Sequence, residues 1–140
     1  MTNTVIQNAL QALASRDPDQ ISSVLTEDAE WLSPPGNATA VALKTPPGPM
    51  VGRAVIVRFF AEDFPRLFAR DLDVTLHHLH ADGEWGVAEA TVAATLANGN
   101  RYVNDYCFVF ELHDGLIHRV REYTDTARGH RMVFGEVPQQ

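Results

Sequence analysis

The chain has little of what marks exported, membrane-spanning or disulfide-stabilised proteins. Its 140 residues include one cysteine, Cys107, so no internal disulfide can form. No apolar run approaches the ~20 residues that a membrane-spanning helix needs. The start of the chain has neither the basic stretch nor the continuous apolar stretch of an export signal. We therefore expect a reduced, cytoplasmic protein with no membrane partner.

Basic residues are also scarce. Eleven Lys and Arg against eighteen Asp and Glu give a formal net charge of −7. A field of that sign repels nucleic acid and anionic lipid, so neither is an expected partner. Apolar residues make up 45% and charged residues 21% of the chain, which is typical of a globular protein. Because no repeat or linker divides it, we expect residues 1–140 to form a single domain.

The first half of the sequence predicts three helices. Apolar residues at helical spacing indicate the first over about residues 3–15, and Asp17 with Pro18 and Gln20 predicts a capped start for the second. The third follows Gly52, and Pro65 should end or kink it. Residues 28–33 are predicted to form a strand. The proline-rich residues 34–51 predict a long connection without regular structure, of the kind that forms lids or binding loops.

The second half carries three turn signals sixteen residues apart, at Asp82-Gly83, Asn98-Gly99 and Asp114-Gly115. They predict an antiparallel meander with strands at about 72–80, 85–97, 100–112 and 116–125. Residues 126–134 then add a short helix or an extended tail. Helices followed by a meander indicate an α+β fold, in which the helices cover one face of the sheet.

Residues 102–112, 114–117 and 121–126 resemble the SnoaL-like, ketosteroid isomerase-like branch of the nuclear transport factor 2-like superfamily. The stretches around Glu27-Asp28-Ala29 and Gly52-Arg53 fit the same pattern. The resemblance implies three N-terminal helices packed in the concave face of a curved antiparallel sheet. This cone-like α+β barrel would enclose an apolar pocket. The superfamily includes polyketide cyclases, ketosteroid isomerases, limonene epoxide hydrolases, dehydratases and non-catalytic members.

The hairpin turns predict which side chains share that pocket. A two-residue loop at Asn98-Gly99 would pair Thr91 with Tyr106 and Glu89 with Phe108. For the last hairpin, a two-residue loop would bury two arginines, so we prefer a three-residue loop, which pairs Tyr106 with Glu122 and Asn104 with Thr124. The first hairpin places His78 opposite Val87 and diagonal to Glu89. The predicted pocket face therefore carries His78, Glu89, Thr91, Asn104, Tyr106, Phe108, Val120 and Glu122, with Trp31 and Ser33 from the first strand and Phe60 from the third helix.

Glu122 is the strongest candidate for a catalytic acid or base. Among apolar neighbours its pKa would rise, so it could exchange a proton near neutral pH. A purely structural glutamate is the alternative. By resemblance, limonene epoxide hydrolases carry an acid at this place, but they use an Arg and an Asp where this chain has Glu89 and Thr91. That constellation is incomplete here.

The other candidates have supporting roles. Glu89 is either a second carboxylate of the site or an acid at its rim. Tyr106 and Asn104 could stabilise oxyanion charge, or Tyr106 could simply anchor the sheet. His78 could serve as a base. We expect no metal, because His78 and His80 lack a third ligand, and no cofactor.

We therefore predict a cofactor-independent acid/base enzyme that acts on a small hydrophobic carbonyl or epoxide compound, as a SnoaL-like cyclase, isomerase or dehydratase. The alternatives are a non-catalytic small-molecule-binding or dimerisation module, and an epoxide hydrolase with an altered triad. A homodimer is expected through the outer face of the sheet, which we assign Val103, Cys107, Val109, Ile117 and Tyr123.

Overall fold

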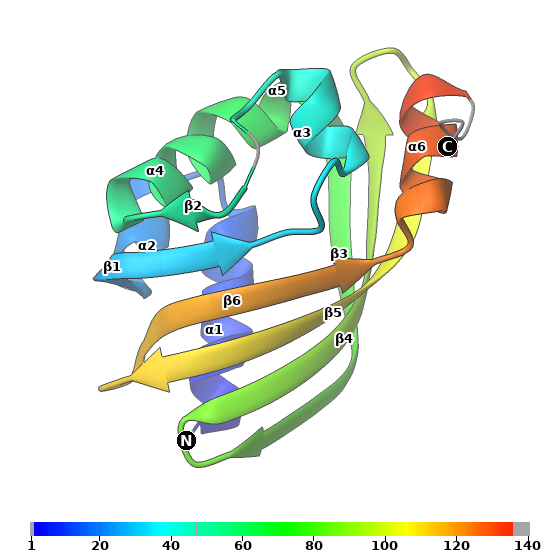
Figure 1. Cartoon of the computed structure of the whole chain (residues 1–140). Coiled ribbons are helices and arrows are strands. Elements are labelled where there is room, and N and C mark those ends of the chain that lie inside the picture. The colour runs from blue at the N-terminus through cyan, green and yellow to red at the C-terminus, as the bar shows by residue number, and fades with distance from the viewer. Residues whose placement is uncertain (1, 47, 136–140) are drawn as a thin grey trace.

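A curved six-stranded sheet with helices on its concave side forms the framework of the computed structural model, which describes residues 2–46 and 48–135 (Figure 1). Before the meander come α1 (Thr2–Ala14), α2 (Pro18–Ser23), β1 (Leu25–Leu32), α3 (Ala38–Leu43), β2 (Met50–Val51), α4 (Arg53–Arg58), the π-helical turn η1 (Phe59–Asp63) and α5 (Phe64–Leu67). The meander and the last helix are β3 (Phe68–Asp82), β4 (Trp85–Leu96), β5 (Arg101–His113), β6 (Leu116–Thr124) and α6 (Thr126–Phe134). The α+β prediction is confirmed.

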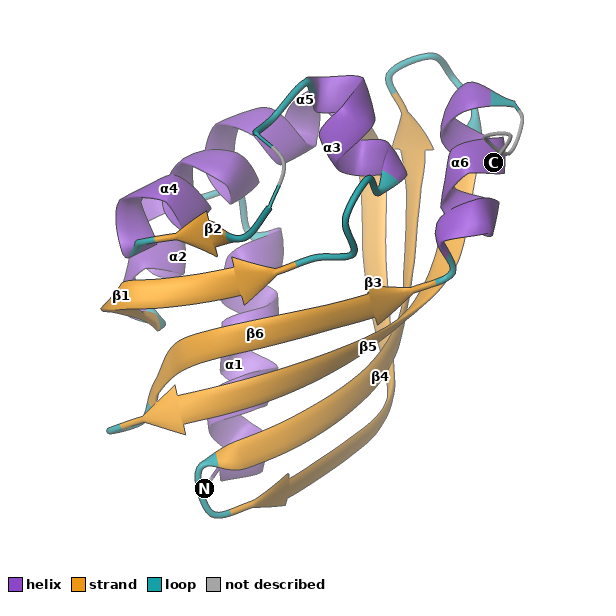
Figure 2. Cartoon of the chain, in the orientation of Figure 1, coloured by secondary structure: helices purple, strands orange, loops and turns teal. Residues whose placement is uncertain are grey.

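The strand order is β2-β1-β6-β5-β4-β3, in which β1 runs parallel to β6 and every other pair is antiparallel. Figure 2 shows α1 behind the middle strands, with α3, α4 and α5 across one end of the sheet. Ile6 and Leu13 of α1 join Phe110 and Val120 in the main core. The first helix therefore closes the concave face at the end away from α3. None of the helices in the described ranges is both long and apolar enough to cross a membrane.

The second helix begins at its predicted cap. The Asp17 side chain accepts a hydrogen bond from the Asp19 amide, and the Gln20 side chain donates to the Asp17 carboxylate. At the other end of the chain, Asp125 accepts from the Arg128 amide and begins α6. The final segment is therefore a helix rather than a tail.

The third predicted helix is continuous but changes its winding in the middle. Pro65 has no N–H to donate to the Ala61 carbonyl, and its ring would clash there in a regular α-helix. The Phe64 N–H instead reaches the Phe59 carbonyl, which makes the turn Phe59–Asp63 π-helical. The proline thus neither ends nor sharply breaks the helix.

The prediction that residues 34–51 lack regular structure is wrong. Asn37 accepts a hydrogen bond from the Ala40 amide and caps α3, and Lys44 ends that helix in a left-handed conformation with φ 56°. Met50 and Val51 then pair with β1. Pro47, which belongs to this segment, lies outside the described residues.

The predicted register between β4 and β5 is wrong by one residue. The Leu96 N–H bonds to the Asn100 carbonyl, so the loop contains three residues rather than two. Glu89 therefore lies opposite Cys107, and Thr91 opposite Asp105. Because successive side chains alternate between faces, this slip turns both residues to the outer face of the sheet.

The last hairpin reaches the predicted face by another route. Its loop has two residues, Asp114 and Gly115, both at positive φ, rather than the three we expected. The pairing then shifts because His118 is an extra residue on β6, a β-bulge. Glu122 consequently faces inward but lies opposite Phe108, not opposite Tyr106.

Three further placements are corrections. His78 lies opposite Glu89 rather than Val87, because the two loop residues are Gly83 and Glu84, one position later than expected. Thr124 lies opposite Tyr106, not Asn104. Ile117 is buried in the core instead of the outer face, because it precedes the bulge in β6.

Candidate active site

A cavity of about 710 Å³ lies between the concave face of the sheet and the helices across its end. Its walls are mainly apolar, with side chains from α1, η1, α5 and the sheet: Leu13, Phe59, Phe64, Phe68, Val92 and Phe108. The segment that contains α3 and β2 supplies another wall. Small-molecule sites have this size and character.

Glu122 of β6 lies in the wall of this cavity, where part of its surface is accessible from inside. The Trp31 indole Nε1 donates a hydrogen bond of 3.0 Å to the Glu122 Oε1 atom. Trp31 is itself buried and packs edge-on against Phe60 at 4.9 Å and Phe108 at 6.0 Å between ring centroids. This packing fixes the indole, and the indole fixes the orientation of the carboxyl group.

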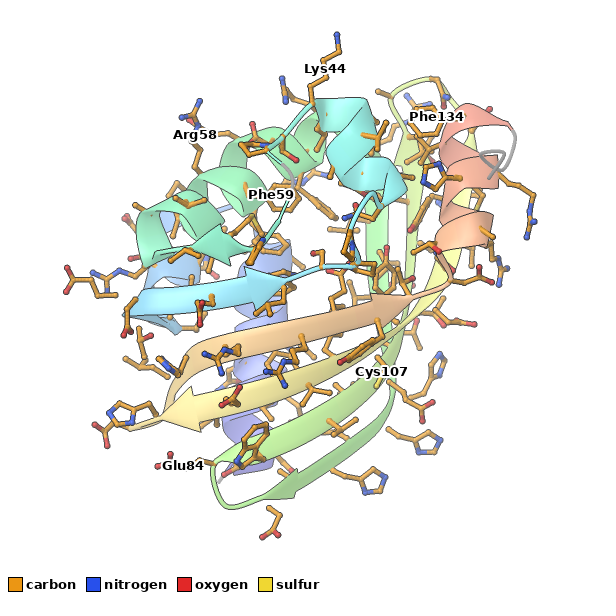
Figure 3. The ribbon with its side chains drawn as sticks, viewed as in Figure 1. Lys44, Arg58, Phe59, Glu84, Cys107 and Phe134 are labelled. Atoms are coloured by element: carbon orange, nitrogen blue, oxygen red, sulfur yellow. The ribbon has the colours of Figure 1, made fainter. Side chains whose placement is uncertain are left out.

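Burial raises the pKa of Glu122 to about 7, against the smaller opposing effect of hydrogen bonds from Trp31 and Ser33. The ion pairs among the described residues do not include Glu122. Lys44 and Arg58 contribute to the cavity lining, but their side chains project away from the molecule (Figure 3). Asp63, a second carboxylate in the lining, pairs with Arg66 at 3.5 Å. Glu122 can therefore gain or lose a proton near neutral pH.

Tyr106 of β5 also lines the cavity, and its ring stacks on Phe108 at 5.5 Å. Its hydroxyl group is hydrogen-bonded to the hydroxyl of Tyr102, four residues earlier on the same strand. Burial raises the pKa of both tyrosines, most strongly that of Tyr106. Both hydroxyl groups consequently stay protonated at neutral pH and can donate hydrogen bonds.

Asn104, which we expected in the pocket, is fully buried outside the main cavity. Its Nδ2 donates to the Asp125 carbonyl at 2.9 Å and to the Tyr102 hydroxyl at 3.3 Å. It lines a separate hollow of about 10 Å³ with Tyr102, Tyr106 and other residues. Asn104 can reach a ligand in the main cavity only through the two tyrosines.

Three other predicted site residues face away from the cavity. Glu89 and His78 are exposed opposite each other on the outer face. Thr91 on the same face donates to Asp105 at 2.7 Å and contacts His77 at 2.7 Å. The register shifts described above account for all three positions. Neither a second carboxylate at Glu89 nor a base at His78 is part of this cavity.

The structure brings the remaining predicted residues together around Glu122. Trp31, Ser33, Phe60 and Phe108 line the cavity, whereas Val120 is fully buried in the core beneath it. The sequence did not identify Tyr102, although it shares an inward face with Asn104 and Tyr106. The sequence favoured a lid or binding loop at residues 34–51, and these residues do line the cavity, but it did not predict α3 within them.

Metal ligands do not gather anywhere in the described part of the chain, where no three His, Cys, Asp or Glu side chains could hold an ion together. The His78 and His80 rings stack on the outer face of the sheet, with 6.4 Å between their centroids. Among the side chains that line the main cavity, burial raises the pKa of Glu122 and of Tyr106.

This combination of a curved sheet, helices over its concave side and an acid in an apolar cavity defines a class of α+β pocket protein. The model of the SnoaL-like domain matches residues 6–120, so the chain belongs to that family. The resemblance noted in the sequence is thereby confirmed.

Solved structures show the same fold. An NTF2-like protein of unknown function from Burkholderia pseudomallei K96243 has a TM-score of 0.80 at 19% identity, covering 96% of this chain and 98% of that one. TerC, co-crystallized with polyporic acid, has a TM-score of 0.79 at 22% identity, covering 95% and 98%. An LEH-like epoxide hydrolase of M. tuberculosis has a TM-score of 0.73 at 21% identity, covering 96% and 90%. Comparison with curated proteins finds no match.

Proposed function

We propose that the chain is a cofactor-independent acid/base enzyme that moves a proton on a small hydrophobic carbonyl compound, in a cyclisation, isomerisation or dehydration of the SnoaL-like type. The observation that carries this proposal is Glu122, a carboxyl group in an apolar cavity, oriented by Trp31 at 3.0 Å and with a pKa of about 7. General acids and bases work best when their pKa lies near the working pH.

The cavity supports a substrate of moderate size. Its volume of about 710 Å³ falls within the range of small-molecule sites, and its aromatic walls favour an apolar molecule. Tyr106 can donate a hydrogen bond to an oxygen that gains negative charge when Glu122 removes a neighbouring proton. TerC, which has a similar fold, was co-crystallized with an organic compound, polyporic acid, and this supports a search among such compounds.

Hydrogen–deuterium exchange tests the reaction without knowledge of the product. The chain should accelerate exchange at the α-carbon of a hydrophobic ketone such as 2-tetralone in D₂O, followed by NMR. Glu122→Gln should lower that rate by about 10²-fold, because it removes the acid/base group. Glu89→Gln is the matched control, since Glu89 is exposed on the outer face, and it should retain the rate. An exchange rate in Glu122→Gln equal to that of the parent chain would refute the proposal.

A non-catalytic binding protein is the second candidate, favoured by the fact that Glu89 and His78 do not join Glu122 in the cavity. It would bind hydrophobic ligands equally well with and without the Glu122 carboxyl group, and it would not accelerate exchange.

Epoxide hydrolysis is a third candidate, suggested by the similar fold of the M. tuberculosis enzyme. The outward positions of Glu89 and Thr91 weigh against a triad like that of limonene epoxide hydrolases. Incubation with simple epoxides in ¹⁸O-labelled water tests it, since a hydrolase would form labelled diol.

A further inference from the structure

Three polar side chains on β5 form a chain of hydrogen bonds that ends at the cavity. Asn104 contacts the Tyr102 hydroxyl, Tyr102 contacts the Tyr106 hydroxyl, and Tyr106 lines the cavity. The first two residues are almost completely buried, so the partners of their polar groups can be accounted for one by one.

The orientation of the Asn104 amide is fixed by partners that can each play one role. The Asp105 backbone N–H can only donate, and it bonds to Asn104 Oδ1 at 3.0 Å. The Asp125 backbone carbonyl can only accept, and it bonds to Asn104 Nδ2 at 2.9 Å. The second Nδ2 hydrogen therefore points to the Tyr102 oxygen, which acts as an acceptor.

The Tyr102 hydroxyl must then give its own hydrogen to Tyr106. Its hydrogen-bond partners among the described residues are Asn104, which donates, and Tyr106. A buried hydroxyl hydrogen without an acceptor is energetically unfavourable, so the Tyr106 oxygen accepts it. Thr124, opposite Tyr106, donates its own hydrogen to the Asp105 carbonyl at 2.8 Å. The Thr124 oxygen, which also interacts with the Tyr106 hydroxyl group, can accept the Tyr106 hydrogen until a ligand oxygen in the cavity replaces it.

We infer that Tyr102, held by Asn104, is a positioning residue that keeps the Tyr106 hydroxyl group as a hydrogen-bond donor toward a ligand oxygen in the cavity. This inference rests on the proposed function and narrows its substrate class. The ligand presents an oxygen that carries or gains negative charge, as a ketone does on becoming an enolate, beside an apolar body that fills the aromatic part of the cavity.

The test is a double-mutant cycle in a Glu122→Gln background, which makes the result independent of proton transfer by Glu122. Binding of 4-nitrophenol is followed by the absorbance of its phenolate. Tyr102→Phe and Tyr106→Phe should each weaken binding about tenfold, because a hydrogen bond to a charged oxygen is impaired or lost. The two together should weaken binding no more than Tyr106→Phe alone. The control Tyr123→Phe removes an exposed hydroxyl group and should change nothing.

A second variant guards against loss of folding in Tyr102→Phe. Asn104→Asp removes both amide hydrogens, the one that Tyr102 accepts and the one bonded to the Asp125 carbonyl, so circular dichroism must first show that the variant is folded. In the folded variant Tyr102 can donate toward residue 104 and Tyr106 toward Tyr102. It should weaken binding as much as Tyr106→Phe does. The inference is overturned if Tyr102→Phe or Asn104→Asp binds as tightly as the background, or if the two Tyr→Phe losses add. It is also overturned if the background binds the probe no better than Tyr106→Phe. Failure of ketone exchange by Glu122 alone would leave these outcomes unchanged.

Discussion

The Glu122 carboxyl group is placed where its charged form is costly. Burial raises its pKa from 4.5 to about 7, so between these values the folded chain holds a proton that the unfolded chain has released. The free energy of unfolding therefore falls as the pH rises through this window and stays lower above it. The buried Glu122 carboxyl group therefore lowers the free energy of unfolding at neutral pH, the range in which it can exchange a proton.

A pH series of urea unfolding measures this cost. Between pH 4.5 and 8 the Glu122 contribution should lower the free energy of unfolding by up to about 3 kcal/mol. Glu122→Gln should remove that fall and be more stable than the parent chain at pH 8. Glu89→Gln, on the exposed face, should leave the slope unchanged. A parent chain whose stability is flat or rises across this window would contradict a raised pKa.

The fluorescence of Trp31 should report the protonation of Glu122. The chain has two tryptophans, so Trp85→Phe leaves Trp31, bonded to Glu122 at 3.0 Å, as the single indole. Its emission should titrate with a midpoint near pH 7, because the hydrogen bond it donates strengthens when the carboxyl group ionises. The transition should vanish in Trp85→Phe/Glu122→Gln. A midpoint near 4.5 in the first variant would show an ordinary, hydrated carboxyl group.

For single residues, the sequence predicted correctly that Glu122 faces inward. It did not predict that Glu89, Thr91 and His78 face outward. Burying two arginines was expensive enough to select the correct face of β6. No such cost of burial distinguished the two faces of β4, because Ala88 and Ala90 on one face are as small as Ala93 on the other. The Asn98-Gly99 turn fits a two- or a three-residue loop, so Glu89 and Thr91 were assigned to the wrong face.

Gly86 of β4 lets α1 pack closely against the sheet. A Cβ atom there would overlap the Ile6 side chain, which is fully buried. Gly86→Ala should cost about 1–3 kcal/mol of stability, because the buried Ile6 side chain must shift against its neighbours in the core. Gly86→Ala with Ile6→Val should be less destabilised than the sum of the two single changes, as thermal or urea unfolding can show. Additive losses would mean that Gly86 and Ile6 do not contact.

Element positions followed from the sequence wherever a local signal was strong. The cap at Asp17 fixed the start of the second helix, and the turn glycines located the strands within a few residues. The sequence did not predict α3, because a helix of six residues in a proline-rich segment has too short an apolar pattern to recognise. Its Asn37 cap and its packing against α6 and α5 are tertiary facts, visible once the chain is folded.

The whole molecule leaves large apolar side chains exposed on the outer face of the sheet. Trp85, Val87 and Tyr123 keep 51%, 39% and 56% of their surface exposed. We propose a homodimer through this face, because burying such side chains against a second copy would release water. Val87→Glu with Tyr123→Glu should give monomers in sedimentation equilibrium, whereas Val41→Glu, exposed on α3, should not. A parent chain that sediments as a monomer at high concentration would exclude this dimer.

The bulge at His118 also bears on how relatives of this chain would change over time. Glu122 faces the cavity because β6 contains one residue more than its partner strand between the turn and the site. Deletion of a single residue there would keep the hairpin and its hydrogen bonds but turn the carboxyl group outward. In this fold an active site can therefore be lost or regained by a one-residue length change, with every chemically important side chain still present. Counting the residues between Gly115 and the acid would distinguish such relatives more reliably than identity at Glu122 alone.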